Sequence, residues 1–271
     1  MLDTARLNGA LVSRPVLWRE VRVVEETGST NADLLAEARS GAREGLVLVA
    51  EAQAAGRGRM GRRWISPPHS ALTFSVLLRP ASVPAGLLGW LPVLAGVAVA
   101  AALAETAGVD ARLKWPNDVL AGDAKLAGIL AERWGEAVVV GTGINVFQRR
   151  DELPVPTATS VSLAAPTAGV DVRERLLTAV LGEFADRYRA WLDQPHPGDA
   201  DGCGLRQEYL RRSGTVGTVV TVMLPGGQHL TGTAVGIDPA GRLELRTPAG
   251  PVKVSAGEVV HLRSAETATA Q

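Results

Sequence analysis

The feature that most restricts how this chain can fold is the stretch from Pro80 to Ala104, which contains no charged side chain. Such a stretch is long enough to cross a bilayer as a helix. It is built largely from Ala, Gly, Leu and Val, however, it contains Pro84 and Pro92, and no basic cluster lies beside it. Membrane spans are usually flanked by basic and aromatic anchors. We therefore expect a buried helix of a water-soluble fold, from about Val93 to Thr106.

The regions on either side of this predicted helix alternate between β-rich segments and turn residues. Gly28-Ser29-Thr30-Asn31 is expected to open a short helix, with Asp33 as an approximate capping-box partner of Thr30 and Gly41 after the last turn. Turns at 122–123 and 135 predict an antiparallel meander in the middle of the chain. The strands that we expect are 21–26, 46–50, 72–78, 112–115, 119–121, 125–132 and 137–140.

A long helix is predicted after residue 170, and a region with the pattern of short strands and turns follows it. Asp171 is a good N-cap residue with Glu174 at the capping-box position, and the prolines at 195 and 197 would end the helix. From Thr218 onward, short alternating strands are separated by turns rich in proline and glycine. We therefore expect a large domain of residues 1–213, a small β-barrel-like domain of residues 214–264 and a frayed tail of residues 265–271. The apolar residues with helical spacing in the long helix are Leu177, Val180, Phe184, Tyr188 and Trp191.

Charge and cysteine content argue against several classes of partner and compartment. The chain has 28 basic and 28 acidic residues, so no global field favours DNA or an anionic membrane, and we expect neither as a partner. The single cysteine, Cys203, cannot form an internal disulfide. The first residues include Asp3 and Arg6 where a signal peptide would have an apolar core. These features favour a cytoplasmic protein.

The most informative segment is the run Gly56-Arg57-Gly58-Arg59-Met60-Gly61-Arg62-Arg63-Trp64. Glycines let backbone N–H groups approach an anion, and guanidinium groups pair with carboxylate or phosphate oxygens. The spacing GxGxxG also occurs in dinucleotide-binding folds, but there it opens a helix, whereas Pro67 and Pro68 follow here. We therefore expect the segment to bind a negatively charged small molecule. A solvated, arginine-rich loop is the alternative.

Four further segments could line the same site, although each also has a simpler explanation. The segment Lys114-Trp115-Pro116-Asn117-Asp118 could simply be a turn, because Pro, Asn and Asp favour turns. Lys125 begins an otherwise apolar strand, so its charge must reach the sheet edge or a partner anion, with a surface lysine as the alternative. The small residues of 141–145 would let a ligand approach the backbone, or they form a hairpin turn. Ser29-Thr30-Asn31 could be a helix cap or could hydrogen-bond a polar ring.

Motifs for metal binding or nucleophilic catalysis are missing from the sequence. The four histidines lie far apart without the spacing of a zinc site, so the sequence places no metal ligands. There is also no GxSxG, no Walker GxxxxGK[ST] and no cysteine nucleophile with its base. Electrostatic stabilisation of an anionic reaction remains as the expected chemistry.

Taken together and in this order, these segments resemble the biotin protein ligases. The resemblance runs from about Glu25 to Val146 and rests on GRGRxGR at 56–62, KWPND at 114–118 and KLAGIL at 125–130. It implies that residues 1–213 form an α+β catalytic domain, similar to class II aminoacyl-tRNA synthetases, with a mixed, largely antiparallel sheet and flanking helices. The small β domain would be the family's SH3-like module.

The resemblance also implies a reaction and its residues. Biotin and ATP, with Mg²⁺, would form biotinyl-5′-adenylate, and a lysine of a carboxylase's biotin carboxyl carrier domain would then accept the biotin. Lys125 and Arg59 would be catalytic, with Lys125 bridging carboxylate and phosphate oxygens. The residues implied at biotin are Ser29, Thr30, Asn31, Gln53, Arg57, Gly58, Arg59, Lys125 and Gly128. The residues implied at ATP are Arg57, Arg59, Arg62, Trp64, Asn117, Lys125 and Asn145.

Two departures from parts of the family affect what the resemblance implies. The first strand begins after only about twenty residues, so we expect the monofunctional type, without the N-terminal DNA-binding domain of some relatives. Pro67-Pro68-His69 is not the family's usual sequence after the arginine segment, which leaves the geometry of that loop open. The alternatives are a lipoate or octanoate transferase of the same superfamily, which we would expect to lack GRGRxGR, and a small-molecule-binding protein without turnover.

Overall fold

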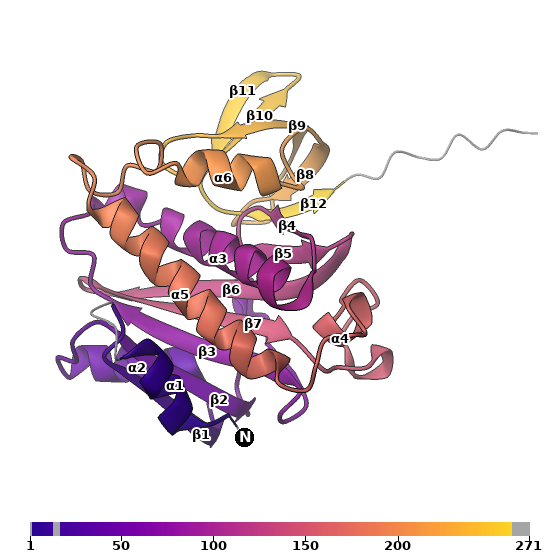
Figure 1. Cartoon of the computed structure of the whole chain (residues 1–271). Helices are drawn as coiled ribbons and strands as arrows, with labels where there is room; N and C mark the ends of the chain where they lie inside the picture. Colours follow the sequence, from indigo (N-terminus) through magenta and orange to yellow (C-terminus); the bar gives the residue numbers. More distant parts are fainter. Residues whose placement is uncertain (1, 13–16, 262–271) are drawn as a thin grey trace, which may run out of the picture.

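The computed structural model describes residues 2–12 and 17–261, which form two β-sheets with helices packed around the larger one (Figure 1). The larger sheet has the strand order β1-β2-β3-β7-β6-β5-β4, and the smaller sheet has the order β11-β10-β9-β8-β12. The strands of the larger sheet are β1 (Glu20–Thr27), β2 (Leu46–Gln53), β3 (Ala71–Leu78), β4 (Ala111–Lys114), β5 (Asp118–Ala121), β6 (Ala124–Trp134) and β7 (Ala137–Asn145). Those of the smaller sheet are β8 (Val219–Met223), β9 (His229–Ile237), β10 (Leu243–Thr247), β11 (Gly250–Val254) and β12 (Glu258–His261).

The strand pairing confirms the predicted α+β class. In the larger sheet β1 pairs with β2 in parallel and the remaining pairs are antiparallel, and the smaller sheet is antiparallel. The predicted tail of residues 265–271, and residues 262–264 of the predicted small domain, lie outside the described residues. The α-helices are α1 (Thr4–Leu11), α2 (Thr30–Arg39), α3 (Trp90–Ala107), α4 (Val161–Ala164), α5 (Val172–Leu192) and α6 (Leu205–Arg212), and the 3-10 turns are η1 (Arg59–Gly61), η2 (Ala85–Leu87) and η3 (Arg150–Glu152).

Helix α3 is the apolar stretch singled out in the sequence, and it is a core helix. Within the described residues it is the helix long and apolar enough to cross a membrane, but 67% of its most apolar window is buried inside the fold. Its small residues let it pack closely on α5 and on β4 and β6. Gly108, in the left-handed conformation with φ 65°, ends it. The prediction of a buried helix is therefore confirmed.

The two faces of the larger sheet are covered by different helices because the strand residues alternate. Val47 and Val49 of β2 point into the main core with α3 and α5, whereas Leu48 packs with Leu34 and Leu35 of α2 on the other face. Helix α2 is short, so it covers only part of its face. The uncovered part lies beyond the N-terminus of α2, over β3, β7 and β6.

That uncovered part of the sheet carries three glycines in place of side chains. The register of β6 and β7 puts Gly128 opposite Gly143 and Leu130 opposite Gly141, and we call Gly128, Gly141 and Gly143 the glycine strip. A hairpin turn at 141–145, one explanation allowed by the sequence, is wrong, because this segment is the second half of β7 and pairs with both β3 and β6. The strip leaves the backbone open to whatever lies on it.

Two of the predicted capping boxes are also corrected by the structure. Ser29, and not Thr30, is the N-cap of α2, and its hydroxyl accepts from the N–H of Ala32 at 3.4 Å. Asp33 accepts a hydrogen bond from the Thr27 hydroxyl at 2.5 Å and so does not close a capping box. Asp171 stands at the N-cap of α5, but its side chain makes no cap hydrogen bond there. Its carboxylate lies 3.6 Å from Arg175 of the next turn.

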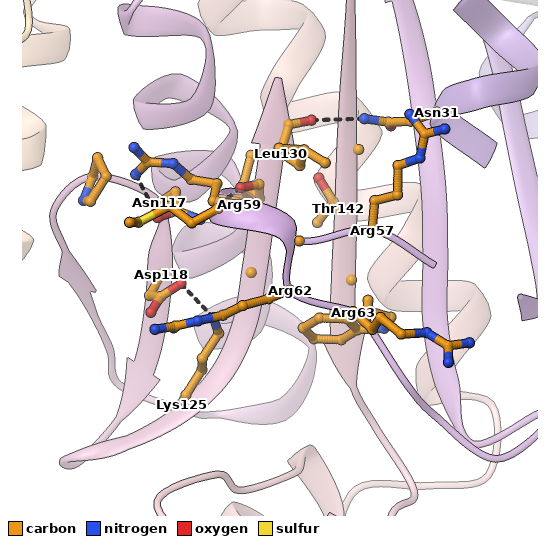
Figure 2. Close-up of a pocket in the computed structure, with 18 of the residues that line it drawn as sticks. Asn31, Arg57, Arg59, Arg62, Arg63, Asn117, Asp118, Lys125, Leu130 and Thr142 are labelled. Carbon is orange, nitrogen blue, oxygen red and sulfur yellow. Dashed lines mark hydrogen bonds and ion pairs between the residues drawn. The ribbon is translucent and has the colours of Figure 1, made fainter. Parts of the chain in front are cut away.

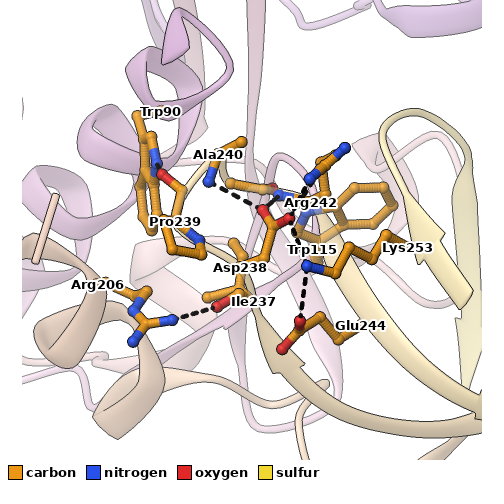
Figure 3. A network of polar contacts seen from close by, with 11 residues as sticks. Trp90, Trp115, Arg206, Ile237, Asp238, Pro239, Ala240, Arg242, Glu244 and Lys253 are labelled. Carbon is orange, nitrogen blue, oxygen red and sulfur yellow. Dashed lines mark hydrogen bonds and ion pairs between the residues drawn. The ribbon is translucent and has the colours of Figure 1, made fainter. Parts of the chain in front are cut away.

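The smaller sheet is attached to the larger one through two tryptophans (Figure 3). The indole N–H of Trp90, at the start of α3, donates to the carbonyl of Pro239 at 2.8 Å, and that of Trp115 donates to Gly241 at 3.1 Å. Asp238 fixes this β9–β10 turn by accepting from the backbone N–H of Ala240 and from Arg242. The turn therefore holds Trp115, the residue that follows β4, against the smaller sheet.

Candidate functional site

A pocket lies beside the glycine strip. It is bounded by the N-terminus of α2, by the loop between β2 and β3, by the turn between β4 and β5, and by the start of β12. The structure thus brings together most of the residues named from the sequence (Figure 2). Those that line the pocket are Ser29, Thr30, Asn31, Gln53, Arg57, Gly58, Arg59, Arg62, Trp64, Asn117, Lys125 and Gly128.

Asn145 is the predicted residue that the structure does not bring to the pocket lining. Its side-chain amide donates to the carbonyl of Thr159 at 2.9 Å, and its oxygen accepts from Gln148 at 3.2 Å. With these bonds and with its burial, Asn145 has a structural role at the end of β7. Its predicted contact with ATP has no support from this geometry.

One end of the pocket is a buried network of uncharged polar groups. The backbone N–H and the hydroxyl of Thr30 both donate to the side-chain oxygen of Gln53, at 2.9 and 3.1 Å. Ser75 of β3, which is fully buried, donates to the side-chain oxygen of Asn31 at 2.6 Å, and its hydroxyl lies 2.7 Å from that of Thr30. The groups that this network presents to the pocket are uncharged and are held in a fixed geometry. They suit a polar, neutral ring.

The other end of the pocket is rich in cations, and most of these are paired with acidic groups or amides. The ammonium of Lys125 lies 2.7 Å from Asp118, and Arg59 donates to the side-chain oxygen of Asn117 at 3.2 Å (Figure 2). Arg62 pairs with Glu258, which comes from β12 of the smaller sheet. Burial lowers the pKa of Arg59, an effect that Asp118 and Glu258 oppose. Because a guanidinium stays protonated in proteins, Arg59 is a permanent cation at this end.

The arginine-rich segment forms a tight hairpin over the strip. Arg57 and Arg63 form an isolated antiparallel bridge, and the N–H of Trp64 donates to the carbonyl of Gly56 at 3.0 Å. Only glycine fits at position 56, because a Cβ there would lie 2.5 Å from the carbonyl oxygen of Trp64. The hairpin places four arginines and Met60 at the pocket through the 3-10 turn η1 and without an α-helix, in agreement with the prediction that this is not a dinucleotide-fold turn.

Trp64 lies directly on the glycine strip. A Cβ on Gly143 would lie 2.4 Å from the indole ring, and one on Gly128 would lie 3.3 Å from the ring and 3.3 Å from the Lys125 nitrogen. The indole N–H of Trp64 is buried and has no hydrogen-bond partner among the residues that the structure describes. The strip thus holds an aromatic ring and an ammonium side by side, and the indole N–H can donate to a ligand.

The exit of this loop adopts a geometry that the sequence left open. His69 has a positive φ of 60°, and its ring lies 2.9 Å from Glu25 and 3.3 Å from Glu51. Glu51 is buried, pairs with Arg173 of α5 and accepts from the N–H of Leu2 at 2.7 Å. The loop therefore returns to β3 through a residue whose ring contacts two carboxylates, one of them buried in the core.

Several lining residues were given no role from the sequence. Thr73 and Phe74 come from β3, Asp118 pairs with Lys125, and Glu258 arrives from the smaller sheet. The polar residues Thr73 and Ser75 alternate within an otherwise apolar strand, and this pattern could have marked them as a polar face. Glu258 carries no comparable signal, because its part in the site depends on how the two sheets pack. Within the described residues no cluster of three or more metal-binding side chains occurs.

The pocket has the shape and chemistry to hold a small molecule with a neutral polar ring and an anionic part. The ring end offers hydroxyls and amides, the cation end offers Arg59, Arg62 and Lys125, and the glycine strip lets pocket side chains lie close to the backbone of the sheet. Fixed cations stabilise most strongly the charge that develops in a reaction. The arrangement is therefore suited to group transfer at a carboxylate or phosphate.

Comparison with known proteins agrees with this chemistry. The profile of the "Biotin/lipoate A/B protein ligase family" matches residues 23–146, and that of the "Biotin protein ligase C terminal domain" matches residues 215–262. The chain is 45% identical over 269 residues to the "Biotin--[acetyl-CoA-carboxylase] ligase" of Mycobacterium tuberculosis, covering 97% of this chain and 96% of that protein. It is 32% identical to the "Bifunctional ligase/repressor BirA" of Escherichia coli, covering 90% of this chain and 73% of that protein.

A solved structure extends the similarity to three dimensions. The biotin protein ligase from Aquifex aeolicus in complex with biotin and ATP superimposes with a TM-score of 0.76 at 29% identity, over 91% of this chain and all of that one. The similarity thus covers both sheets and the pocket between them. On the strength of these matches along nearly its whole length, the chain belongs to the biotin protein ligase family.

Proposed function

We propose that this protein is an ATP-dependent biotin protein ligase that uses the pocket on the glycine strip for both half-reactions. In the first, a carboxylate oxygen of biotin attacks the α-phosphorus of ATP, the bond to the β-phosphate bridging oxygen breaks, and pyrophosphate leaves. In the second, a lysine amine of a carrier protein attacks the acyl carbon of biotinyl-5′-adenylate, an amide forms, and AMP leaves with its electron pair. The observation that carries the proposal is the joining of a neutral polar end and a cationic end in one pocket.

The roles of the pocket residues follow from this arrangement. Asn31, Thr30, Ser29 and Gln53 hydrogen-bond the ring system of biotin at the neutral end. Lys125 lies over Gly128 and bridges the biotin carboxylate and the α-phosphate, where its charge offsets the repulsion between two anions. Arg57, Arg59 and Arg62 stabilise the phosphoryl oxygens, and Trp64 and Asn117 contact the nucleotide.

Mg²⁺ is proposed as a companion of ATP. The ion is commonly bound through one or two carboxylates together with substrate phosphates, and the pocket contains two carboxylates, Asp118 and Glu258. Both now pair with cations of the same site, Lys125 and Arg62. These residues fit such an ion as oxygen ligands, and the ion would supply charge neutralisation on the phosphates.

We further propose the biotin carboxyl carrier domain of a carboxylase as the acceptor, on the basis of the name of the Mycobacterium tuberculosis relative. A cytoplasmic location is proposed because the single Cys203 offers no internal disulfide. The two sheets define a catalytic unit and an SH3-like unit, and we propose the boundary near 213–214 that the sequence suggested.

The test is pyrophosphate release from MgATP with biotin or lipoate, for wild type and Lys125→Ala. We expect biotin-dependent release that falls about a hundredfold to a thousandfold in the variant, the effect of removing one fixed donor. Arg43→Ala is the matched control, because it removes an exposed cation that does not line the pocket. Release with lipoate alone, or no release from folded protein, would contradict the proposal.

A further inference from the structure

Glu132 of β6 contacts both ends of the recognition machinery, although no motif of the sequence singled it out. One carboxylate oxygen accepts from the side-chain amide of Asn31 at 2.8 Å, and the other lies 3.3 Å from a guanidinium nitrogen of Arg57. Asn31 belongs to the neutral end of the pocket, and Arg57 begins the arginine hairpin. Figure 2 shows the Arg57 side chain directed toward Asn31. Glu132 thus joins two segments that are 26 residues apart in the chain, α2 and the loop after β2.

The Asn31 side of this bridge is fixed in orientation. Its amide nitrogen donates to Glu132 and, at 3.2 Å, to the carbonyl of Leu130, and its oxygen accepts from Ser75. The backbone of Gly141 packs so closely that a Cβ there would lie 2.2 Å from the Asn31 oxygen. Both amide hydrogens are therefore used, while the oxygen keeps a second lone pair for a ligand donor.

The Arg57 side of the bridge is the base of the hairpin. Arg57 pairs with Arg63 across the hairpin, and the N–H of Gly58 donates to the carbonyl of Arg62 at 2.8 Å. A restraint on the Arg57 side chain therefore restrains both strands of the hairpin. The Arg57 side chain is 53% exposed and that of Glu132 is 25% exposed, so their ion pair is worth a small free energy that can be changed by a ligand.

We propose that Glu132 is a positioning residue that ties the arginine hairpin to Asn31 and transmits ligand contact at Asn31 to Arg57. A ring N–H that donates to the Asn31 oxygen polarises the amide, which strengthens its hydrogen bond to Glu132. The carboxylate is then held more firmly, and Arg57 with it. The Asn31–Glu132–Arg57 bridge itself follows from the contacts of the ligand-free protein, whereas its response to biotin rests on the proposed function.

The Asn31–Glu132–Arg57 bridge is tested without ligand by limited trypsin digestion, because trypsin cleaves after arginine and the hairpin carries four arginines. We compare wild type with Glu132→Gln, which keeps an acceptor for Asn31 but loses the charge, and with Glu132→Ala, which loses both. The matched control is Glu136→Gln, an exposed position on the turn after β6. We expect cleavage within residues 57–63 to become about twofold to fivefold faster in both Glu132 variants, the factor that an exposed ion pair provides. Unchanged cleavage in both variants would refute the claim that Glu132 restrains the hairpin.

The response to ligand is tested by repeating the digestion with saturating biotin and by steady-state kinetics. We expect biotin to protect the wild-type hairpin, and this protection to be smaller by about twofold to fivefold in Glu132→Gln. The KM for biotin should rise by a similar factor while the KM for ATP stays within about twofold. Equal protection in wild type and Glu132→Gln would refute the transmission alone. If calorimetry shows no biotin binding to wild type, the proposed function fails. The ligand-free digestion still tests whether Glu132 restrains the hairpin.

Discussion

Replacing Gly141 with alanine tests whether the glycine strip sets the position of Asn31. The new Cβ would lie 2.2 Å from the Asn31 oxygen and 2.9 Å from its Cγ, where an ordinary contact is at least 3.4 Å. The side chain must therefore move by about 1.2 Å (3.4 minus 2.2). Such a shift breaks hydrogen bonds to Ser75 and Glu132 that are now 2.6 and 2.8 Å long.

The magnitude follows from the bonds that are lost. Leaving one buried polar group unsatisfied costs about 1–3 kcal/mol, which corresponds to a fall in Tm of roughly 2–12 °C for a domain of this size. If Asn31 contacts biotin as proposed, a similar loss of binding free energy weakens the affinity by about fivefold to 150-fold. Thermal unfolding and calorimetric titration with biotin measure the two effects.

Two further variants make this prediction specific. Gly182→Ala, in α5, has open space around its Cβ, so we expect normal biotin binding and a stability gain of up to about 1 kcal/mol. Adding Gly141→Ala to Asn31→Ala should cost less than Gly141→Ala costs in wild type, because the clashing group is gone. Normal affinity in Gly141→Ala, or fully additive effects in the double variant, would refute the reasoning.

Three other variants test the fold and the cation end. Burial alone would raise the pKa of Glu51, but hydrogen bonds from Arg173 and from the Leu2 N–H outweigh it and hold this pKa below its ordinary value of 4.5. The stability from this pair is thus fully present above pH 4.5 and is lost as the pH falls through the lower folded pKa. Glu51→Gln should therefore cost about 3–5 kcal/mol at pH 7 and less once the pH falls through the lowered pKa of Glu51, as measured by urea unfolding. Trp115→Phe removes the hydrogen bond to Gly241 and should lower the free energy of unfolding by about 1 kcal/mol, whereas the exposed Trp134→Phe should have little effect. Asp118→Asn removes the charge beside Lys125 and should lower kcat/KM for pyrophosphate release by about tenfold or more, with a change in stability below about 1 kcal/mol; unchanged kinetics would contradict a role for Asp118.

The parts of the fold that could be predicted are those set by local patterns. The apolar run that became α3 and the alternating strands of the meander are specified by residues close in sequence, and the structure confirms both. The parallel pairing of β1 with β2 was not predicted, because it depends on α2 crossing over the sheet. Helices α1 and α6 were missed as well. Helix α6, with the sequence LRQEYLRR, buries only Leu205 and Tyr209, so its apolar periodicity is weak.

The candidate site likewise has residues that a local motif predicts and residues whose position depends on long-range contacts. Lys125, Arg59 and Asn117 come from motifs that the sequence displays, and they meet in the pocket as expected. Asn145 closes the same run of small residues, yet it faces Thr159 and Gln148 and not the pocket. The period of two along β7 puts Asn145 on the same face as Gly141 and Gly143, but Asn145 is the last residue of the strand, where its side chain bonds to Thr159 and Gln148 beyond the pocket. A motif therefore identifies a segment, while contacts with residues outside the motif decide which of its side chains reach the pocket.

The contribution of the smaller sheet depends on packing that no local pattern encodes. Glu258 pairs with Arg62, which is 196 residues earlier in the chain, and it reaches the pocket because the β9–β10 turn binds Trp90 and Trp115. Trp115 itself lines the pocket and precedes Asn117 and Asp118. The hydrogen bonds that attach the smaller sheet are therefore also the ones that hold the wall of the pocket. Loosening this attachment should disturb the cation end before the neutral end, since the hydrogen bonds of Asn31, Thr30 and Gln53 lie within α2 and the larger sheet.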